Sequence, residues 1–178
     1  MHTQQYVLLG IMVLGGAAVI GSYIYGFATH PGSADALWGG VTGGLRTVNF
    51  VTMILAVIGY FAFSYWLFFR IDPDSILIAN RFGFWLFHIV FLFILIPSAL
   101  WMPLTHAYVA QPSTGLWIGI RIVLALVGIA SLALLWAILV VSPREGNLAY
   151  WFAVGGAAAF SIQTAIQDML IWPAIFSR

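Results

Sequence analysis

The sequence has no cysteine and no lysine, and it has few charged residues of any kind. Only 6% of its 178 residues are charged, whereas a soluble domain carries roughly a quarter. The absence of cysteine excludes disulfides, thiolate metal ligands and cysteine nucleophiles. The net charge is +1, which gives no electrostatic basis for binding nucleic acid, so nucleic acid is excluded as a partner. This composition is not typical of a globule surrounded by water.

Long apolar runs take the place of charged surface. Hydrophobic residues make up 63% of the chain, and eight tryptophans stand among them. Runs of about 20 apolar residues are long enough to cross a bilayer as helices. The sequence therefore predicts an all-α integral membrane protein, a multi-pass bundle of five transmembrane helices with short loops, in one transmembrane domain over residues 1–178. The predicted spans are 6–27, 45–69, 76–101, 116–141 and 148–176.

The tryptophans support this division into five spans. Trp151 and Trp172 stand about 31 Å apart along a helix, and Trp117 and Trp136 about 28 Å, near the bilayer core thickness of about 30 Å. Alternating helices place four tryptophans on each side of the membrane, as expected for two interfacial belts. The belt on the N-terminal side holds Trp66, Trp85, Trp136 and Trp151, and the other holds Trp38, Trp101, Trp117 and Trp172.

Two prolines predict a kink and an end in the third span, and one serine predicts the start of a short helix. Pro97 is expected to kink the third span and Pro103 to end it, since proline cannot donate a backbone hydrogen bond. Ser33 is placed to cap a short interfacial helix between the first two spans.

The arginines give little information about orientation. Three flank each side of the membrane, so the count of positive charges is equal. They are Arg70, Arg81 and Arg144 on the N-terminal side, and Arg46, Arg121 and Arg178 on the other. If Arg46 and Arg121 point into the bundle, the remaining charges place the N-terminus in the cytoplasm.

A polar stripe follows the fifth span. On an α-helix its five polar side chains fall within one arc of roughly 160°. They are Ser161, Gln163, Thr164, Gln167 and Asp168. Hydrocarbon cannot solvate amides or a carboxylate, so this stripe is expected to face protein or water.

Other spans contribute polar groups at a similar depth, which suggests a ligand site. The candidate residues are Arg46, Asn49, Trp101, His106, Arg121, Gln163, Gln167 and Asp168. We expect Asp168 to pair with Arg46 or Arg121, leaving the other arginine for a carboxylate or phosphate group. In the structural alternative, the arginines reach lipid phosphates and the amides join neighbouring helices.

Two classes of function follow from this pattern. The first is binding or transport of a small amphipathic, anionic molecule or lipid in a polar pocket between the second, fourth and fifth spans. The second is a non-catalytic accessory subunit of a larger membrane complex, or a homo-oligomer, packed through two small-residue surfaces. These surfaces are Ala18, Ser22 and Gly26 on the first span and 155–159 on the fifth. No catalytic pattern is present, so an enzyme acting on lipid, with His106 or Asp168 as base, ranks third.

Histidines raise the question of a cofactor or metal. His88 could ligate a haem or chlorin, but bis-histidine ligation needs a second intramembrane histidine, and a hydrogen bond to a neighbouring helix explains His88 more simply. The cofactor is therefore left unknown. His30, Asp35, His106 and Asp168 are metal-ligand types, but their spacing matches no metal signature, so no metal site is predicted.

In architecture the chain resembles the tryptophan-rich sensory/translocator proteins, which bind porphyrins and sterols. The likeness rests on five short-looped spans, a length under two hundred residues and abundant tryptophan; of tryptophan–proline pairings the chain has only Trp101-Met-Pro103 and Trp172-Pro173. The dense tryptophan–proline motifs of that family are absent. The resemblance therefore implies a ligand-binding bundle but assigns no residue.

Overall fold

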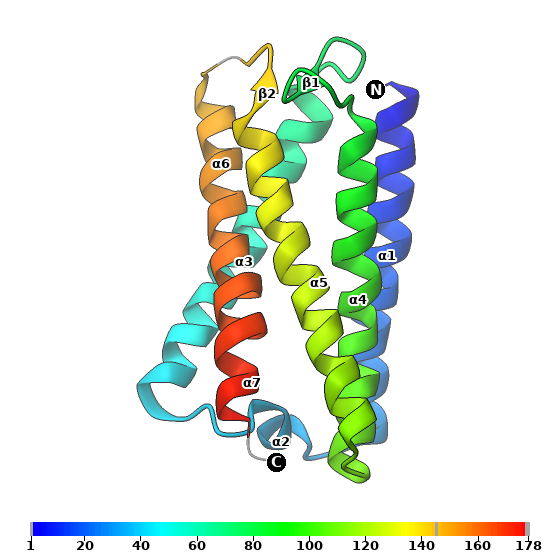
Figure 1. Ribbon diagram of the computed structural model, residues 1–178, viewed down its shortest axis with the longest axis vertical. Helices are drawn as coiled ribbons and strands as arrows, with labels where there is room; N and C mark the ends of the chain where they lie inside the picture. The colour runs from blue at the N-terminus through cyan, green and yellow to red at the C-terminus, as the bar shows by residue number, and fades with distance from the viewer. Residues whose placement is uncertain (1, 145, 177–178) are drawn as a thin grey trace.

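A computed structural model describes residues 2–144 and 146–176 and confirms the all-α, five-helix bundle (Figure 1). Five helical segments are long and apolar enough to cross a membrane, consistent with a multi-pass integral membrane protein. They are α1 (Thr3–Thr29), α3 (Gly43–Phe69), α4 (Trp85–Ala110), α5 (Thr114–Leu139) and a continuous segment made of α6 (Leu148–Ser161), η1 (Ile162–Ile171) and α7 (Trp172–Ile175).

Short elements close the two ends of the bundle. The strands β1 (Leu77–Ile78) and β2 (Val141–Ser142) pair antiparallel at the end that holds the N-terminus (Figure 1). At the opposite end lies α2 (Ala34–Trp38), the short helix expected after Ser33. The Ser33 hydroxyl does not cap this helix, because it bonds to His106 Nε2 at 3.0 Å instead.

The third membrane-crossing helix differs from the predicted span 76–101. It begins at Trp85, because Leu77–Ile78 pairs with β2 and Ile78 is fully buried at the end of the bundle that holds the N-terminus. It continues to Ala110, with both Pro97 and Pro103 inside it. A proline within a helix loses a hydrogen bond at a cost of about 3 kcal/mol. Packing of α4 against α1 and α5 outweighs that cost, so Pro103 does not end the helix.

The helices form a row in which α1 and α3 are the two ends. α1 packs on α4, α4 on α5, α5 on α6 and η1, and α6 on α3. Two glycines allow the backbones of α3 and α6 to touch, since a Cβ on Gly156 would lie 2.6 Å from the Gly59 carbonyl oxygen. The small-residue surface expected on the fifth span is thus used partly within the molecule.

α1 and α3 are joined at one end. The Gln5 side-chain amide lies 3.1 Å from the carbonyl oxygens of Leu67 and Phe68 and 3.3 Å from that of Ile71. Carbonyls in the last turn of a helix have no partner within the helix, so Gln5 satisfies groups at the end of α3. From this junction the two helices diverge toward the other end of the bundle (Figure 1).

The buried core is divided into two clusters. The larger lies toward the end with the β-strands and includes Phe63, Phe87, Phe91, Leu134 and Tyr150. The smaller gathers aromatic side chains toward α2 and α7. Its buried members are Val41, Tyr108, Trp117, Ile120, Leu124, Trp172 and Phe176.

Candidate functional site

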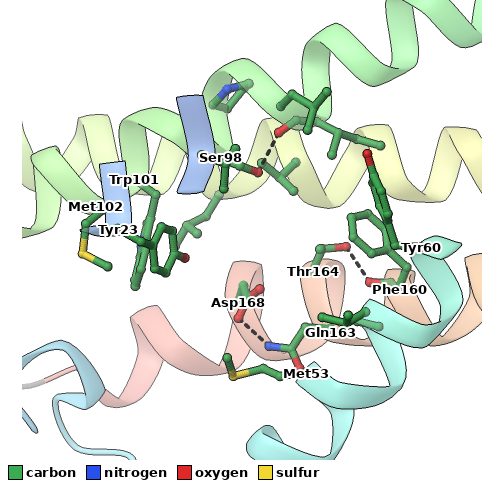
Figure 2. A pocket seen from close by; sticks show the side chains of 18 of the residues that line it. Tyr23, Met53, Tyr60, Ser98, Trp101, Met102, Phe160, Gln163, Thr164 and Asp168 are labelled. Atoms are coloured by element: carbon green, nitrogen blue, oxygen red, sulfur yellow. Dashed lines mark hydrogen bonds between the residues drawn. The ribbon is translucent and has the colours of Figure 1, made fainter. Parts of the chain in front are cut away.

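A cavity of about 570 Å³ lies inside the bundle and reaches residues of both core clusters (Figure 2). All five membrane-crossing segments and α2 contribute to its walls, which are mainly apolar and aromatic. The cavity therefore involves more of the fold than the predicted pocket between the second, fourth and fifth spans.

The opening of the cavity lies between α1 and α3. Some lining residues are also well exposed: Ile20 on α1 at 62%, and Val57 and Phe61 on α3 at 58% and 68%. Val57 stands near the middle of α3, so in a membrane this opening is level with the hydrocarbon. The exposed lining is apolar, which suits contact with acyl chains.

Polar groups gather on the inner wall where η1 faces α3. Gln163 Nε2 donates to Asp168 Oδ1 at 2.9 Å and lies 3.3 Å from Asn49 Oδ1. Thr52 donates its hydroxyl to Gln163 Oε1. Gln163 thus links a carboxylate on η1 to two polar side chains on α3.

This polar wall is built on a π-helix rather than the α-helix assumed from the sequence. In a π-helix the backbone hydrogen bonds join residues five apart, and such turns are frequent at functional sites. Gln163 and Asp168 are five residues apart, so one turn of η1 brings their side chains together. The polar stripe does face protein, as expected, since Gln163, Thr164 and Gln167 are buried.

η1 is held against α5 by hydroxyl groups. Thr164 donates to Ser131 Oγ at 2.6 Å, and Ser161 donates to the Ser131 carbonyl oxygen at 3.0 Å. Ser131 is fully buried, so these bonds form away from solvent. They fix the position of the π-helix relative to the cavity.

The expected ion pair between Asp168 and an arginine does not form. Arg46 instead pairs with Asp35 at 2.9 Å and lies over the Trp38 ring, 4.9 Å from its centroid. Arg121 is exposed on the outer surface of α5. Within residues 2–144 and 146–176, Asp168 has no basic partner. Both arginines lie within about two turns of a helix start, where a long side chain reaches the interface more readily than the bundle interior.

Four of the eight candidate residues line the cavity and four do not. Those that line it are Asn49, Trp101, Gln163 and Asp168; those that do not are Arg46, His106, Arg121 and Gln167. Two of the residues that do not line the cavity, His106 and Gln167, are nevertheless buried, in different surroundings. His106 is buried, stacks on His30 with ring centroids 4.3 Å apart and bonds to Ser33. Gln167 is buried beside the cavity, and its Oε1 has no hydrogen-bond partner in the described part of the chain.

Nothing in the sequence indicates that α1 takes part in the site. Tyr23 lines the cavity and its ring lies 5.9 Å from that of Trp101. α1 is apolar around its whole circumference, so periodicity could not show which of its faces turns inward. Contact with α4 determines that face.

His88 bonds to a neighbouring helix. Its Nε2 lies 2.8 Å from the backbone carbonyl oxygen of Gln4 on α1. Because α4 extends to Ala110, His106 is also in a membrane-crossing helix, although the predicted third span ends at residue 101 and would leave His106 in the following loop. The two histidines are eighteen residues apart on one helix (88 to 106), about 27 Å, so they cannot face one metal centre.

One surface cluster in the described chain brings three residues of metal-ligating type together. Donor atoms of His2, Asp72 and Asp74 lie within 4.8 Å of one another. His2 Nδ1 is 2.8 Å from Asp74, and its Nε2 is 3.6 Å from Asp72. Each imidazole nitrogen of His2 thus faces a different carboxylate. This arrangement links the start of α1 to the loop after α3 through side-chain contacts and does not direct all three residues at one ion.

Comparison with protein-family models, curated proteins and solved structures finds no match for this chain. The likeness to the tryptophan-rich sensory/translocator proteins therefore remains one of architecture. The cavity is therefore the feature of this chain that bears on its function.

Proposed function

We propose that the protein binds or transports a small amphipathic molecule, or a lipid, that reaches the cavity from the bilayer between α1 and α3. The observation that carries this proposal is the cavity of about 570 Å³, with an apolar opening at mid-membrane depth and polar groups on its inner wall.

The size and chemistry of the cavity support this proposal. Ligand pockets are commonly about 300–1,000 Å³, mainly apolar, with a few placed polar groups. Here those groups are Asn49, Gln163, Thr164 and Asp168, together with the Tyr23 hydroxyl. An amphipathic molecule would place its apolar part against the aromatic walls and its polar part against η1.

The position of the opening supports a route through the membrane. A hydrophobic molecule concentrates in the bilayer, so an opening level with the acyl chains admits it without passage through water. The Gln5 junction holds α1 and α3 together at one end, so access is expected where the helices diverge.

Native mass spectrometry of the gently purified protein tests the proposal. We expect the wild type to retain a small molecule or lipid that Val57→Trp loses, because the larger side chain would block the opening. Ile58→Trp is the matched control, since Ile58 is 59% exposed on the same helix but does not line the cavity. Arg121→Ala is also expected to keep the retained molecule.

Retention by the wild type and Ile58→Trp, but not by Val57→Trp, would support the proposal. A wild-type protein that carries nothing, or a molecule that Val57→Trp retains equally, would contradict it.

The second candidate is an accessory subunit, and the outer surface of α1 favours it. Gly10, Ala17 and Gly21 share one exposed face, and nothing lies within 4 Å of a Cβ built on either glycine. Helices approach closely through such surfaces in membranes. Co-purification of a stoichiometric partner that is lost in Gly21→Leu would support this candidate, whereas a stable monomer that carries a ligand would oppose it.

We propose that the N-terminus lies in the cytoplasm. Arg70, Arg81 and Arg144 lie in the loops at the end that holds the N-terminus, whereas Arg46 and Arg121, on the other side, lie inside α3 and α5. Within the described part of the chain, arginines in loops therefore favour the N-terminal side as the cytoplasmic one. The cysteine-free chain allows single cysteines at Gln111 or Gly146 to be labelled in intact cells with an impermeant maleimide. Labelling at Gly146 rather than Gln111 would contradict this orientation.

A further inference from the structure

We infer that the polar part of the ligand is an organic monocation, of ammonium type, held by the Asp168 carboxylate and a wall of aromatic rings. This inference rests on the proposed function and specifies the class of molecule that the cavity takes. It replaces the anionic head group expected from the sequence.

The charge of the lining favours a cation. Asp168 is the only lining residue with a carboxylate, and no arginine, lysine or histidine lines the cavity in the described chain. Its Oδ1 accepts from Gln163, and no hydrogen bond to Oδ2 is found among residues 2–144 and 146–176. A carboxyl group in an apolar site either takes up a proton or is accompanied by an opposite charge, because an isolated carboxylate is costly there. A bound cation would supply that charge.

An aromatic wall faces this carboxylate. The rings of Tyr23 and Trp101 lie 5.9 Å apart, and those of Trp101 and Trp172 are also 5.9 Å apart. Figure 2 shows Tyr23 and Trp101 projecting from α1 and α4 into the space that Asp168 enters from η1. Aromatic faces attract ammonium groups, and a desolvated cation–π contact contributes about 2 kcal/mol.

An anionic ligand would lack a counter-charge in this cavity. Arg46, a candidate arginine that contacts the lining residue Trp38, is bound to Asp35. An anion at the polar wall would instead meet Asp168, and like charges repel strongly where the surroundings are apolar.

The remaining walls define the body of the ligand. Apart from Ser98, whose hydroxyl donates to the Ile94 carbonyl at 2.6 Å, they are apolar or aromatic, with Met53, Tyr60, Phe160 and Val127 among them. A bare metal ion would find one carboxylate and a few amide and hydroxyl oxygens, whereas a cation with an apolar body fills the space. The ligand is therefore expected to be a hydrophobic monocation.

A pair of hydrophobic ions of similar shape and opposite charge tests this inference. Radiolabelled tetraphenylphosphonium and tetraphenylborate are bound to the protein in phosphatidylcholine nanodiscs, with empty discs subtracted. We expect the phosphonium to bind at least tenfold more tightly than the borate. Asp168→Asn should lower phosphonium affinity on the order of tenfold or more, since it removes the charge and keeps the shape. Asp72→Asn, which removes an exposed carboxylate at the end of the bundle that holds the N-terminus, is the matched control.

Each outcome separates this inference from the proposed function. Equal binding of both ions, or tighter binding of the borate, would overturn the cationic ligand; loss of that binding in Val57→Trp would still support a ligand cavity. If neither ion binds, the cationic ligand is overturned unless native mass spectrometry identifies a retained cation. If Asp168→Asn does not fold, the comparison of the two ions on the wild type decides.

Discussion

At the scale of the residue, contact between glycine backbones determines how α3 and α6 meet. Gly59 and Gly156 face each other, and a Cβ on either would collide with the other's backbone, which cannot rotate away as a side chain can. The adjacent Gly155 is exposed and has nothing within 4 Å of its Cβ position. Two neighbouring glycines on one helix thus have different roles.

These glycines give the first prediction. Gly156→Ala should lower the free energy of unfolding by about 1–3 kcal/mol, because overpacking forces the two helices apart. Gly155→Ala should cost nothing and can add stability, since alanine favours a helix over glycine by roughly 0.5–1 kcal/mol. Denaturant-induced unfolding in detergent micelles measures both. Equal stability of the two variants would show that α3 and α6 do not touch at this point.

Residue chemistry also shows what the sequence could and could not predict. The polar stripe on the fifth span was recognisable, because amides and a carboxylate in an apolar run must face protein. The partner of Asp168 was not, since Arg46 and Arg121 could each turn inward or outward by rotation of the helix. The structure pairs Arg46 with Asp35 and leaves Arg121 exposed.

At the scale of the element, the ends of α1 and α3 are connected by one buried amide. Gln5 is 2% exposed, and its Nε2 reaches the carbonyls of Leu67 and Phe68 while its Oε1 accepts from the His2 backbone at 2.9 Å. One side chain therefore satisfies the start of α1 and the end of α3.

Replacement of this amide gives the second prediction. Gln5→Leu should destabilise the protein by about 1–3 kcal/mol, because buried carbonyls would lose their partner. Gln4→Leu is the control, since the Gln4 side chain makes no hydrogen bond in the described part of the chain and only its backbone accepts from His88. Thermal unfolding of both variants in the same detergent compares them. Equal losses would mean that the junction does not depend on the amide.

Element boundaries and helix type were harder to predict than element number. Five apolar runs indicate five helices. The predicted third span includes Ile76 and Ile78, but in the structure these residues are buried before and within β1, at the end of the bundle that holds the N-terminus. The π-helical hydrogen bonding of η1 leaves no mark in hydrophobic periodicity, because the same polar residues fit one face of an α-helix.

At the scale of the whole molecule, a row of helices whose two end helices meet only at one end accounts for the cavity. α1 and α3 meet at the Gln5 junction and diverge from it, and the space between them is bounded by α4, α5 and η1 (Figure 1). Such an opening depends on how helices pack, which hydropathy does not determine. The sequence therefore predicted the polar wall and a pocket between the second, fourth and fifth spans, but not the opening between α1 and α3 or the contribution of α1.

The central claim is that this cavity takes its ligand from the bilayer, and photo-crosslinking tests it most directly. A hydrophobic ammonium carrying a diazirine on its alkyl chain is added to the protein in phosphatidylcholine bilayers, irradiated, and mapped by peptide mass spectrometry. We expect labels to concentrate on cavity residues such as Tyr23, Met53 and Met102, and to diminish when unlabelled tetraphenylphosphonium competes. Labels spread evenly over outward residues such as Ile129 and Phe152, 61% and 62% exposed, and unaffected by the competitor would contradict the account.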